Sequence, residues 1–247
     1  MSVPSDPAPA RETAWQMPET PRVLPFALFL LIGAIPAGAF PGAPFWGYLA
    51  KTVAAGGLLW HFRARIPEMR WAVSGPAVVV GVGIAVLWIG LEGRVPGLEE
   101  LWRAAPGWFG GKAGGPPPPV EPWNPVAYFA TQPLLGWFFV GVRVLGRSLV
   151  VPALEEVFYR SFVYRYVVNP RFLEVPLTRR HLGAWAATAV MFGLVHPGQW
   201  VQGIVCGAAY QWLVLRRGRL GEAMLAHALT NLLISAYAIA SQRWEFT

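Results

Sequence analysis

Residues 148–168 read SLVVPALEEVFYRSFVYRYVV, a mostly apolar run with charged residues in its middle. The run is long enough to cross about 30 Å of hydrocarbon as a helix, yet it contains Glu155, Glu156 and Arg160. A charge near the centre of a bilayer costs about 2.5 to 3.5 kcal/mol on insertion scales, so such groups usually face other protein instead of lipid. The run therefore predicts a membrane helix whose polar residues point into a helix bundle.

The composition of the whole chain also indicates a membrane protein. Of its 247 residues, 55% are apolar and only 13% are charged, which is about half the charged share of a soluble domain. Its 13 tryptophans suit the headgroup region, where one edge of the ring is apolar and the other is wet. The net charge of +7 comes from arginines in short clusters between apolar runs. Because these clusters form no single basic face, no nucleic acid is expected among the partners.

We predict an all-α fold, a polytopic membrane helix bundle with about eight transmembrane helices. The apolar runs that predict these helices are residues 24–40, 45–60, 73–91, 126–142, 148–168, 182–196, 199–215 and 220–240. The second run is short and contains Lys51. Small residues within the runs, such as Gly81 and Gly203, suit close helix packing in lipid.

The domain organisation follows from the segments between these runs. Residues 1–22 are rich in proline and polar groups and are expected to form a flexible N-terminal tail. Residues 92–125 contain a glycine pair and four consecutive prolines, which predicts a connecting loop. Residues 23–247 would then form a single integral membrane domain, because the helices on both sides of the loop share one bundle.

The basic residues do not decide the orientation of these eight predicted helices. Eight of them fall in the tail, the even-numbered loops and the C-terminus, and ten fall in the odd-numbered loops. Cytoplasmic loops normally carry an excess of lysine and arginine. Either the sidedness is weakly specified, or one of the eight predicted helices does not span.

The first polar group lies within residues 148–168. Neighbouring helix positions point about 100° apart, so Glu155 and Glu156 cannot share one role. Glu156 and Arg160 are four residues apart, the spacing at which opposite charges meet on one helix face, and we expect them to pair. Glu155 would then be free to serve the bundle interior. The alternative is that both glutamates are interfacial charges at a helix end.

Two histidines and an asparagine form the rest of the polar set. A proline follows His196 directly, which disfavours helical geometry there and places the imidazole at a helix end. His227 and Asn231 are four residues apart in an apolar run, so they share one helix face. Burying either without a partner would cost about 1 to 3 kcal/mol. The alternatives are an interfacial histidine at His196 and a hydrogen-bond clasp between helices at His227 and Asn231.

Together these segments resemble the CPBP family, which comprises CAAX proteases and bacteriocin-processing enzymes. The family has an EExxxR motif, then FxxxH, then HxxxN, and the matching residues here are Glu155, Glu156 and Arg160, then Phe192 and His196, then His227 and Asn231. The resemblance covers roughly residues 148–240. A fainter resemblance is to a bacterial subgroup described as CAAX prenyl protease-related and associated with exosortase sorting systems.

The resemblance implies a glutamic-type intramembrane endopeptidase that hydrolyses a peptide bond of a membrane-associated or lipidated protein or peptide, with no cofactor or metal. Glu155 and His196 would activate the attacking water, with Glu155 as general base. His227 and Asn231 would stabilise the oxyanion of the tetrahedral intermediate. The supporting residues would be Glu156, Arg160 and Phe192. It also implies a multi-pass protein of the bacterial inner membrane, whose partners are the bilayer and the substrate.

Two other functions would use the same residues. Glu155, His196 and His227 form a plausible zinc ligand set with an open position for water, although no HExxH helix is present. A non-enzymatic transporter or immunity-type membrane protein would use the polar cluster to bind a proton, an ion or a peptide. Sensitivity to a chelator separates the first alternative from a metal-free protease, and substitution of Glu155 or His196 separates the second.

Overall fold

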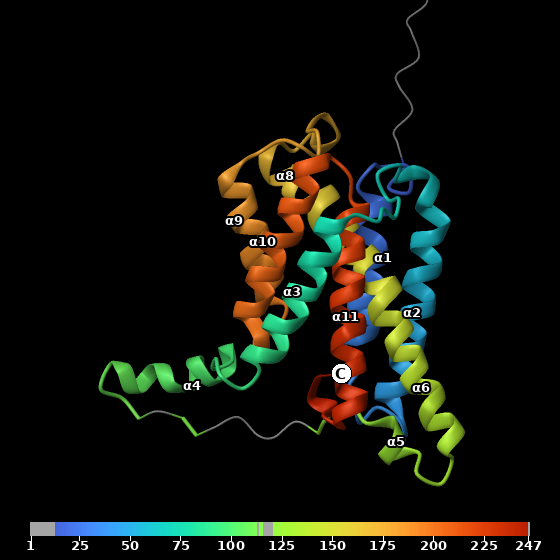
Figure 1. The fold of residues 1–247 in the computed structure, drawn as a ribbon, viewed down its shortest axis with the longest axis vertical. Helices are drawn as coiled ribbons and strands as arrows, with labels where there is room; N and C mark the ends of the chain where they lie inside the picture. Colours follow the sequence, from blue (N-terminus) through green and yellow to red (C-terminus); the bar gives the residue numbers. More distant parts are fainter. Residues whose placement is uncertain (1–12, 113, 116–120, 247) are drawn as a thin grey trace, which may run out of the picture.

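The structure is a computed structural model that describes residues 13–112, 114–115 and 121–246, and every regular element in this part of the chain is a helix. The α-helices are α1 (Thr20–Gly33), α2 (Ala43–Phe62), α3 (Gly75–Leu91), α4 (Leu98–Trp108), α5 (Pro125–Tyr128), α6 (Pro133–Leu145), α7 (Val151–Glu156), α8 (Tyr164–Val168), α9 (Leu182–Leu194), α10 (Trp200–Arg217) and α11 (Gly221–Ser241). Figure 1 shows the long helices side by side, with α4 extending sideways from the lower end of the bundle. The prediction of an all-α fold is confirmed for the described residues.

Local sequence signals explain where several helices begin and end. At the start of α3, the Ser74 hydroxyl accepts a hydrogen bond from the Ala77 N–H at 3.2 Å, which satisfies a donor that the first turn leaves unpaired. At the end of α10, Gly218 takes a left-handed conformation with φ of 68°, which glycine adopts without steric cost. These signals fix the direction in which the chain turns between helices.

The fourth and fifth predicted helices are one continuous helix, so the predicted break between them is wrong. Helix α6 continues through two π-helical segments, η2 (Gly146–Val150) and η3 (Val157–Val163), to the end of α8. The resulting helix, Pro133–Val168, has 36 residues and is about 54 Å long at 1.5 Å per residue. Gly146 lies in η2, and Pro152 lies at the start of α7 directly after it, and neither residue ends the helix. The arginines between the two runs point into the protein instead of forming a loop.

Other predicted boundaries also differ from the structure. Helix α1 begins at Thr20, inside the predicted tail, and ends at Gly33, because the proline-containing segment that follows does not continue the helix. The predicted connecting loop contains α4, whose apolar and polar residues separate to opposite faces, a short pattern that the search for long apolar runs missed. Residues 1–12 of the predicted tail and residues 113 and 116–120 of the predicted loop lie outside the described residues.

Two helices are long and apolar enough to cross a membrane, Pro133–Val168 and Gly221–Ser241. Three apolar helices are shorter, namely α1, α3 and α9. Large apolar side chains cover much of the outer surface of the bundle, as expected for a surface in contact with lipid; they include Leu31, Val53, Trp60, Val79, Val86, Leu134 and Leu149. Predicted close packing is present where a Cβ on Gly81 would lie 2.7 Å from the Ala226 carbonyl oxygen, so α3 and α11 approach each other there.

The bundle has an upper and a lower end in the view of Figure 1. We call the upper end, which carries more of the described basic residues, the basic end, and the lower end the cavity end. At the basic end lie residues 13–22, 63–74, 165–181 and 216–220, held together by contacts such as the bridge between Trp71 and Gly221. At the cavity end lie residues 34–42, 92–112, 114–115, 121–132, 195–199 and 242–246. There, Gln199 Nε2 donates to Glu92 Oε1 at 3.1 Å, which ties two loops of this end together.

Candidate active site

The four residues proposed as catalytic from the sequence line one cavity. Its volume is about 100 Å³, enough for several water molecules, and its walls include Glu155, His196, His227 and Asn231. Three elements supply them: α7 carries Glu155, α11 carries His227 and Asn231, and the turn after α9 carries His196. The structure therefore brings together residues that are up to 76 positions apart in the chain.

Glu156 is at the centre of a sealed ionic cluster behind this cavity. Its Oε2 lies 3.0 Å from Arg160 Nε, so the pair expected from the four-residue spacing is present, and both side chains are fully buried. Its other oxygen, Oε1, lies 3.0 Å from His227 Nδ1. Because a carboxylate only accepts, Nδ1 of His227 is the donor, and Glu156 orients the imidazole as well as neutralising Arg160.

Arg160 connects this cluster to the neighbouring helices. Its NH2 group donates to the Gly207 carbonyl oxygen on α10 at 3.2 Å. Its guanidinium carbon lies 4.8 Å from the ring centroid of Phe192, a cation–π contact that gives the third supporting residue of the family motifs a physical role. Phe192 also lies edge-on to the His227 ring, with centroids 5.9 Å apart.

Glu155 has a different environment from its neighbour. Its side chain is 11% exposed, and its Oε2 lies 3.9 Å from His227 Nε2, too far for a direct hydrogen bond. Among the described residues, nothing donates a hydrogen bond to this oxygen. Glu155 therefore presents an acceptor to the cavity, whereas Glu156 uses its oxygens on protein groups.

His196 is held by the last turn before it. Helix α9 ends at Leu194, and His196 takes a non-helical conformation ahead of its proline, as predicted. Its Nδ1 lies 2.8 Å from the Phe192 carbonyl oxygen, and since a carbonyl only accepts, Nδ1 carries the proton. Nε2 of His196 is then the nitrogen with a free lone pair. The Trp88 ring packs edge-on to the imidazole, with centroids 5.6 Å apart.

Asn231 is positioned by a backbone contact. Its Nδ2 donates to the Arg147 carbonyl oxygen at 2.8 Å. An amide nitrogen has two N–H groups, so one remains for a ligand in the cavity. This carbonyl belongs to the π-helical segment η2, and π-helical segments occur frequently at functional sites.

Other cavity residues were missed from the sequence. The Tyr210 ring stacks on His227 with centroids 5.1 Å apart, and its hydroxyl donates to Thr230 Oγ1 at 2.8 Å. Trp88 and Arg147 also line the cavity. Tyr210 could have been found as a polar hydroxyl within an apolar run, but nothing in the sequence indicates that α3 and η2 reach the site.

The described side chains do not form a metal-binding group. In the described part of the chain, no three histidine, cysteine or carboxylate side chains lie close enough together to hold one ion. Glu155, His196 and His227 could therefore bind a zinc ion together only if these side chains moved.

The fold and the cavity define a helical protein with a buried acid and two histidines among apolar helices, the arrangement of a membrane-embedded hydrolase. Residues 135–233 match the model of a family described as type II CAAX prenyl endopeptidase Rce1-like. This match confirms the resemblance to the CPBP family, and it supports CAAX-type intramembrane protease activity. No curated protein and no solved structure matches the chain.

Proposed function

We propose that this protein is a glutamic-type intramembrane endopeptidase that hydrolyses a peptide bond of a membrane-associated or lipidated protein or peptide. The single observation that carries the proposal is the cavity of about 100 Å³ on which Glu155, His196, His227 and Asn231 converge. A group that attacks a peptide carbonyl needs a base, a positioned water and donors for the oxyanion, and these four side chains can supply all three.

In this mechanism Glu155 and His196 bind the attacking water. Glu155 Oε2, which accepts no hydrogen bond from the described residues, takes the proton as the water adds to the carbonyl carbon. Nε2 of His196 accepts the second hydrogen bond of the water, because its Nδ1 is committed to the Phe192 carbonyl oxygen. The proton is then delivered to the leaving amine when the C–N bond breaks.

His227 and Asn231 stabilise the oxyanion. The free N–H of the Asn231 amide is one donor, and removing a donor of this kind typically costs about 2.7 to 4 kcal/mol of transition-state stabilisation. As an imidazolium, His227 donates from Nδ1 to Glu156 Oε1, 3.0 Å away, and from Nε2 to the oxyanion. Glu156, Arg160 and Phe192 hold the ring in place.

The proposed membrane arrangement is a multi-pass bundle in which residues 23–247 form one domain. The continuous helix Pro133–Val168 replaces two of the eight predicted helices, so we propose seven crossings, by α1, α2, α3, Pro133–Val168, α9, α10 and α11. We also propose the bacterial inner membrane as its location. The narrower resemblance to exosortase-associated proteins stays a prediction, and under it the substrate need not be prenylated.

The test compares wild-type protein with Glu155→Gln and His196→Ala in vesicles, using a library of membrane-anchored peptides. We expect each substitution to reduce cleavage by at least about a hundredfold. Glu174→Gln is the matched control, because Glu174 is exposed and distant in the fold, and it should cleave like wild type. Cleavage that persists in Glu155→Gln would refute the assignment. Activity lost on chelation and restored by zinc would favour the metal alternative.

A further inference from the structure

A groove on the outer surface of the bundle lies apart from the proposed active site. It has a volume of about 500 Å³ and lies between α2, the continuous helix Pro133–Val168 and residues 63–71. It shares no described lining residue with the active-site cavity. Pockets of about 300 to 1,000 Å³ commonly bind small molecules. We call it the outer groove, and all of its described lining residues are apolar except Arg63 and Arg70.

The outer groove begins where α2 touches the continuous helix. A Cβ on Gly56 would lie 3.1 Å from Val150 Cγ1, so the glycine lets α2 pack directly against η2. From this contact the groove extends toward the basic end, where Arg63 and Arg70 line it. Arg63 follows Gly56 by seven positions, a rise of about 10 Å along a helix. The outer groove therefore runs from the basic end into the apolar middle of the bundle.

Exposed apolar side chains form the two sides of the outer groove. Trp60 is 66% exposed on α2, and Leu149 is 53% exposed on the continuous helix. In the proposed membrane arrangement both helices contact lipid, so hydrocarbon fills an open apolar groove between them. Trp60 and Trp71 suit the headgroup level, because an indole ring is apolar and carries one N–H donor. An acyl chain is therefore the group expected in the groove.

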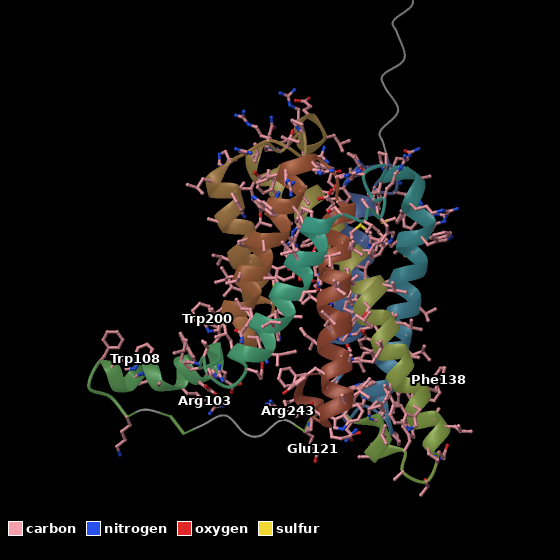
Figure 2. All side chains as sticks on the ribbon, in the orientation of Figure 1. Arg103, Trp108, Glu121, Phe138, Trp200 and Arg243 are labelled. Carbon is pink, nitrogen blue, oxygen red and sulfur yellow. The ribbon has the colours of Figure 1, made fainter. Side chains whose placement is uncertain are left out.

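The mouth of the outer groove carries two arginines that have no carboxylate partner. Arg63 NH1 donates to the Trp60 carbonyl oxygen at 2.8 Å, and its guanidinium lies 4.2 Å from the Trp60 ring centroid. The Arg70 side chain makes no hydrogen bond or ion pair with the described residues. The nearest acidic residue in the sequence, Glu68, is bound to Arg22 at 2.7 Å. Figure 2 shows side-chain nitrogens gathered at the upper end of the bundle, where both arginines of the groove lie.

We propose that the outer groove binds an anionic phospholipid of the bilayer. One acyl chain would lie along the apolar lining, and the phosphate would lie between Arg63 and Arg70. A guanidinium fork donates two parallel hydrogen bonds to phosphate oxygens, and basic pockets between membrane helices are typical sites for anionic headgroups. The inference rests on the proposed membrane arrangement and goes beyond the proposed protease chemistry.

The lipid anchor of a substrate is a different occupant, and the geometry favours the phospholipid. Val150 and Ala153 line the outer groove, whereas Val151 and Glu155 line the active-site cavity. At about 100° per residue these two pairs lie on different faces of one helix, so the helix separates the groove from the cavity. A bound phospholipid would instead support, from outside, the helix that carries Glu155.

The test counts the lipids that stay bound to the purified full-length protein. The detergent micelles contain equal amounts of phosphatidylglycerol and phosphatidylcholine with the same acyl chains, and native mass spectrometry distinguishes the two. Wild type should retain one phosphatidylglycerol with a preference of at least about tenfold, because the choline cation of the other lipid offsets its phosphate charge. Equal retention of both lipids by wild type would overturn the proposal.

A pair of double variants separates the groove from the general charge of the basic end. Arg63→Gln with Arg70→Gln should lose most of the preference for phosphatidylglycerol. Arg179→Gln with Arg180→Gln is the matched control, because it removes two exposed arginines of the same end that do not line the groove. The control should keep the preference. An equal loss in both double variants would mean that overall charge attracts the lipid, and it would refute the site.

Two competitors test the identity of the occupant. Glycerol phosphate carries the headgroup charge without a tail, and it should not displace phosphatidylglycerol from wild type. A lipidated peptide should not displace it either, since the active-site cavity lies on another face of the helix. Displacement by glycerol phosphate would make the groove a site for soluble phosphate. Displacement by the peptide would make it part of the substrate site, and either result would overturn the proposal.

Thermal unfolding gives a second readout that does not involve cleavage. Phosphatidylglycerol should raise the unfolding midpoint of wild type more than phosphatidylcholine does, because a ligand that binds only the folded state stabilises it. The lipid-induced shift is compared, so a double variant of lower stability still gives an answer. The shift should disappear in Arg63→Gln with Arg70→Gln. An equal shift there would contradict the assignment of these arginines, whether or not the protein cleaves peptides.

Discussion

Among the ion pairs of the described residues, two clusters differ in how they are built. The first joins Glu156, Arg160 and His227 within the bundle, where the carboxylate and the guanidinium are fully buried. The second joins Glu68, Arg22, Arg165 and Ser161 at the basic end, where the glutamate is 11% exposed. The first borders the proposed active site, and the second ties the start of α1 to the end of the continuous helix.

The difference in burial and in contact with His227 determines what each cluster can affect. Removing a partner from the first leaves a charge in a sealed interior and also frees the imidazole of His227. Removing a partner from the second leaves groups that water reaches more easily, and none of them lines the cavity. Substitutions in the first cluster should therefore change both stability and activity, whereas substitutions in the second should change stability alone.

The largest effect is expected from Glu156→Ala. It leaves Arg160 buried without its partner, which typically costs about 3 to 5 kcal/mol in the free energy of unfolding. It also removes the acceptor that orients His227, so cleavage should fall by about a hundredfold. Unfolding in mixed detergent micelles and peptide cleavage measure the two effects.

A double variant, Glu156→Leu with Arg160→Met, separates them. Replacing a buried ion pair by apolar side chains of similar volume is often neutral, so stability should recover while cleavage stays low. Recovery of both would mean that Glu156 acts only through the stability of the bundle.

Comparison of the clusters also explains what the sequence could predict. The pairing of Glu156 with Arg160 follows from a four-residue spacing on one helix, and the shared face of His227 and Asn231 follows in the same way. The bond from Arg22 to Glu68 spans 46 positions, and that from Arg22 to Ser161 spans 139. Nothing local indicates such contacts, and Arg22 was accordingly assigned to a flexible tail.

The same limit applies to the helices. Hydropathy found nearly every apolar run, but it could not show that residues 143–147 stay helical. Their arginines contact Tyr48, Trp123 and Phe246, which come from distant parts of the chain. The short amphipathic α4 was missed for a related reason, since its apolar face is too brief to stand out from a Gly/Pro-rich segment. The convergence of the candidate residues on one cavity needed the tertiary structure.

Glu68→Ala should have a smaller effect, confined to stability. It removes an ion pair with Arg22 at 2.7 Å and a contact with Arg165 at 3.6 Å, and leaves two arginines without their acceptor. We expect a loss of about 1 to 3 kcal/mol in the free energy of unfolding, with kcat unchanged. Glu174→Ala, at an exposed pair of the same end, is the control and should change neither. A large loss of cleavage in Glu68→Ala would link this end to the chemistry.

The pH dependence of stability tests whether Glu68 acts through the charge of its carboxylate. Burial alone would raise its pKa, but the charge of Arg22 and the hydrogen bond from Ser161 outweigh burial and hold the pKa below the ordinary value of 4.5. The carboxylate therefore stabilises the folded state fully above pH 4.5, and this stabilisation is lost as the pH falls further, through the folded pKa. The difference in unfolding free energy between wild type and Glu68→Gln should shrink below that pH. A difference that grows on acidification would contradict the sign.

The smallest effect is expected from Ser161→Ala. Its hydroxyl donates to Glu68 and accepts from Arg22 Nε at 2.9 Å and from Arg165 NH1 at 3.5 Å, so the substitution removes three contacts. It leaves the ion pair between Arg22 and Glu68. We expect a loss of about 1 kcal/mol, because the charged partners remain bonded to each other. Ser241→Ala, which removes an exposed hydroxyl bonded to its own helix, should have no measurable effect. If Ser161→Ala costs as much as Glu68→Ala, the hydroxyl and not the charge holds the basic end together.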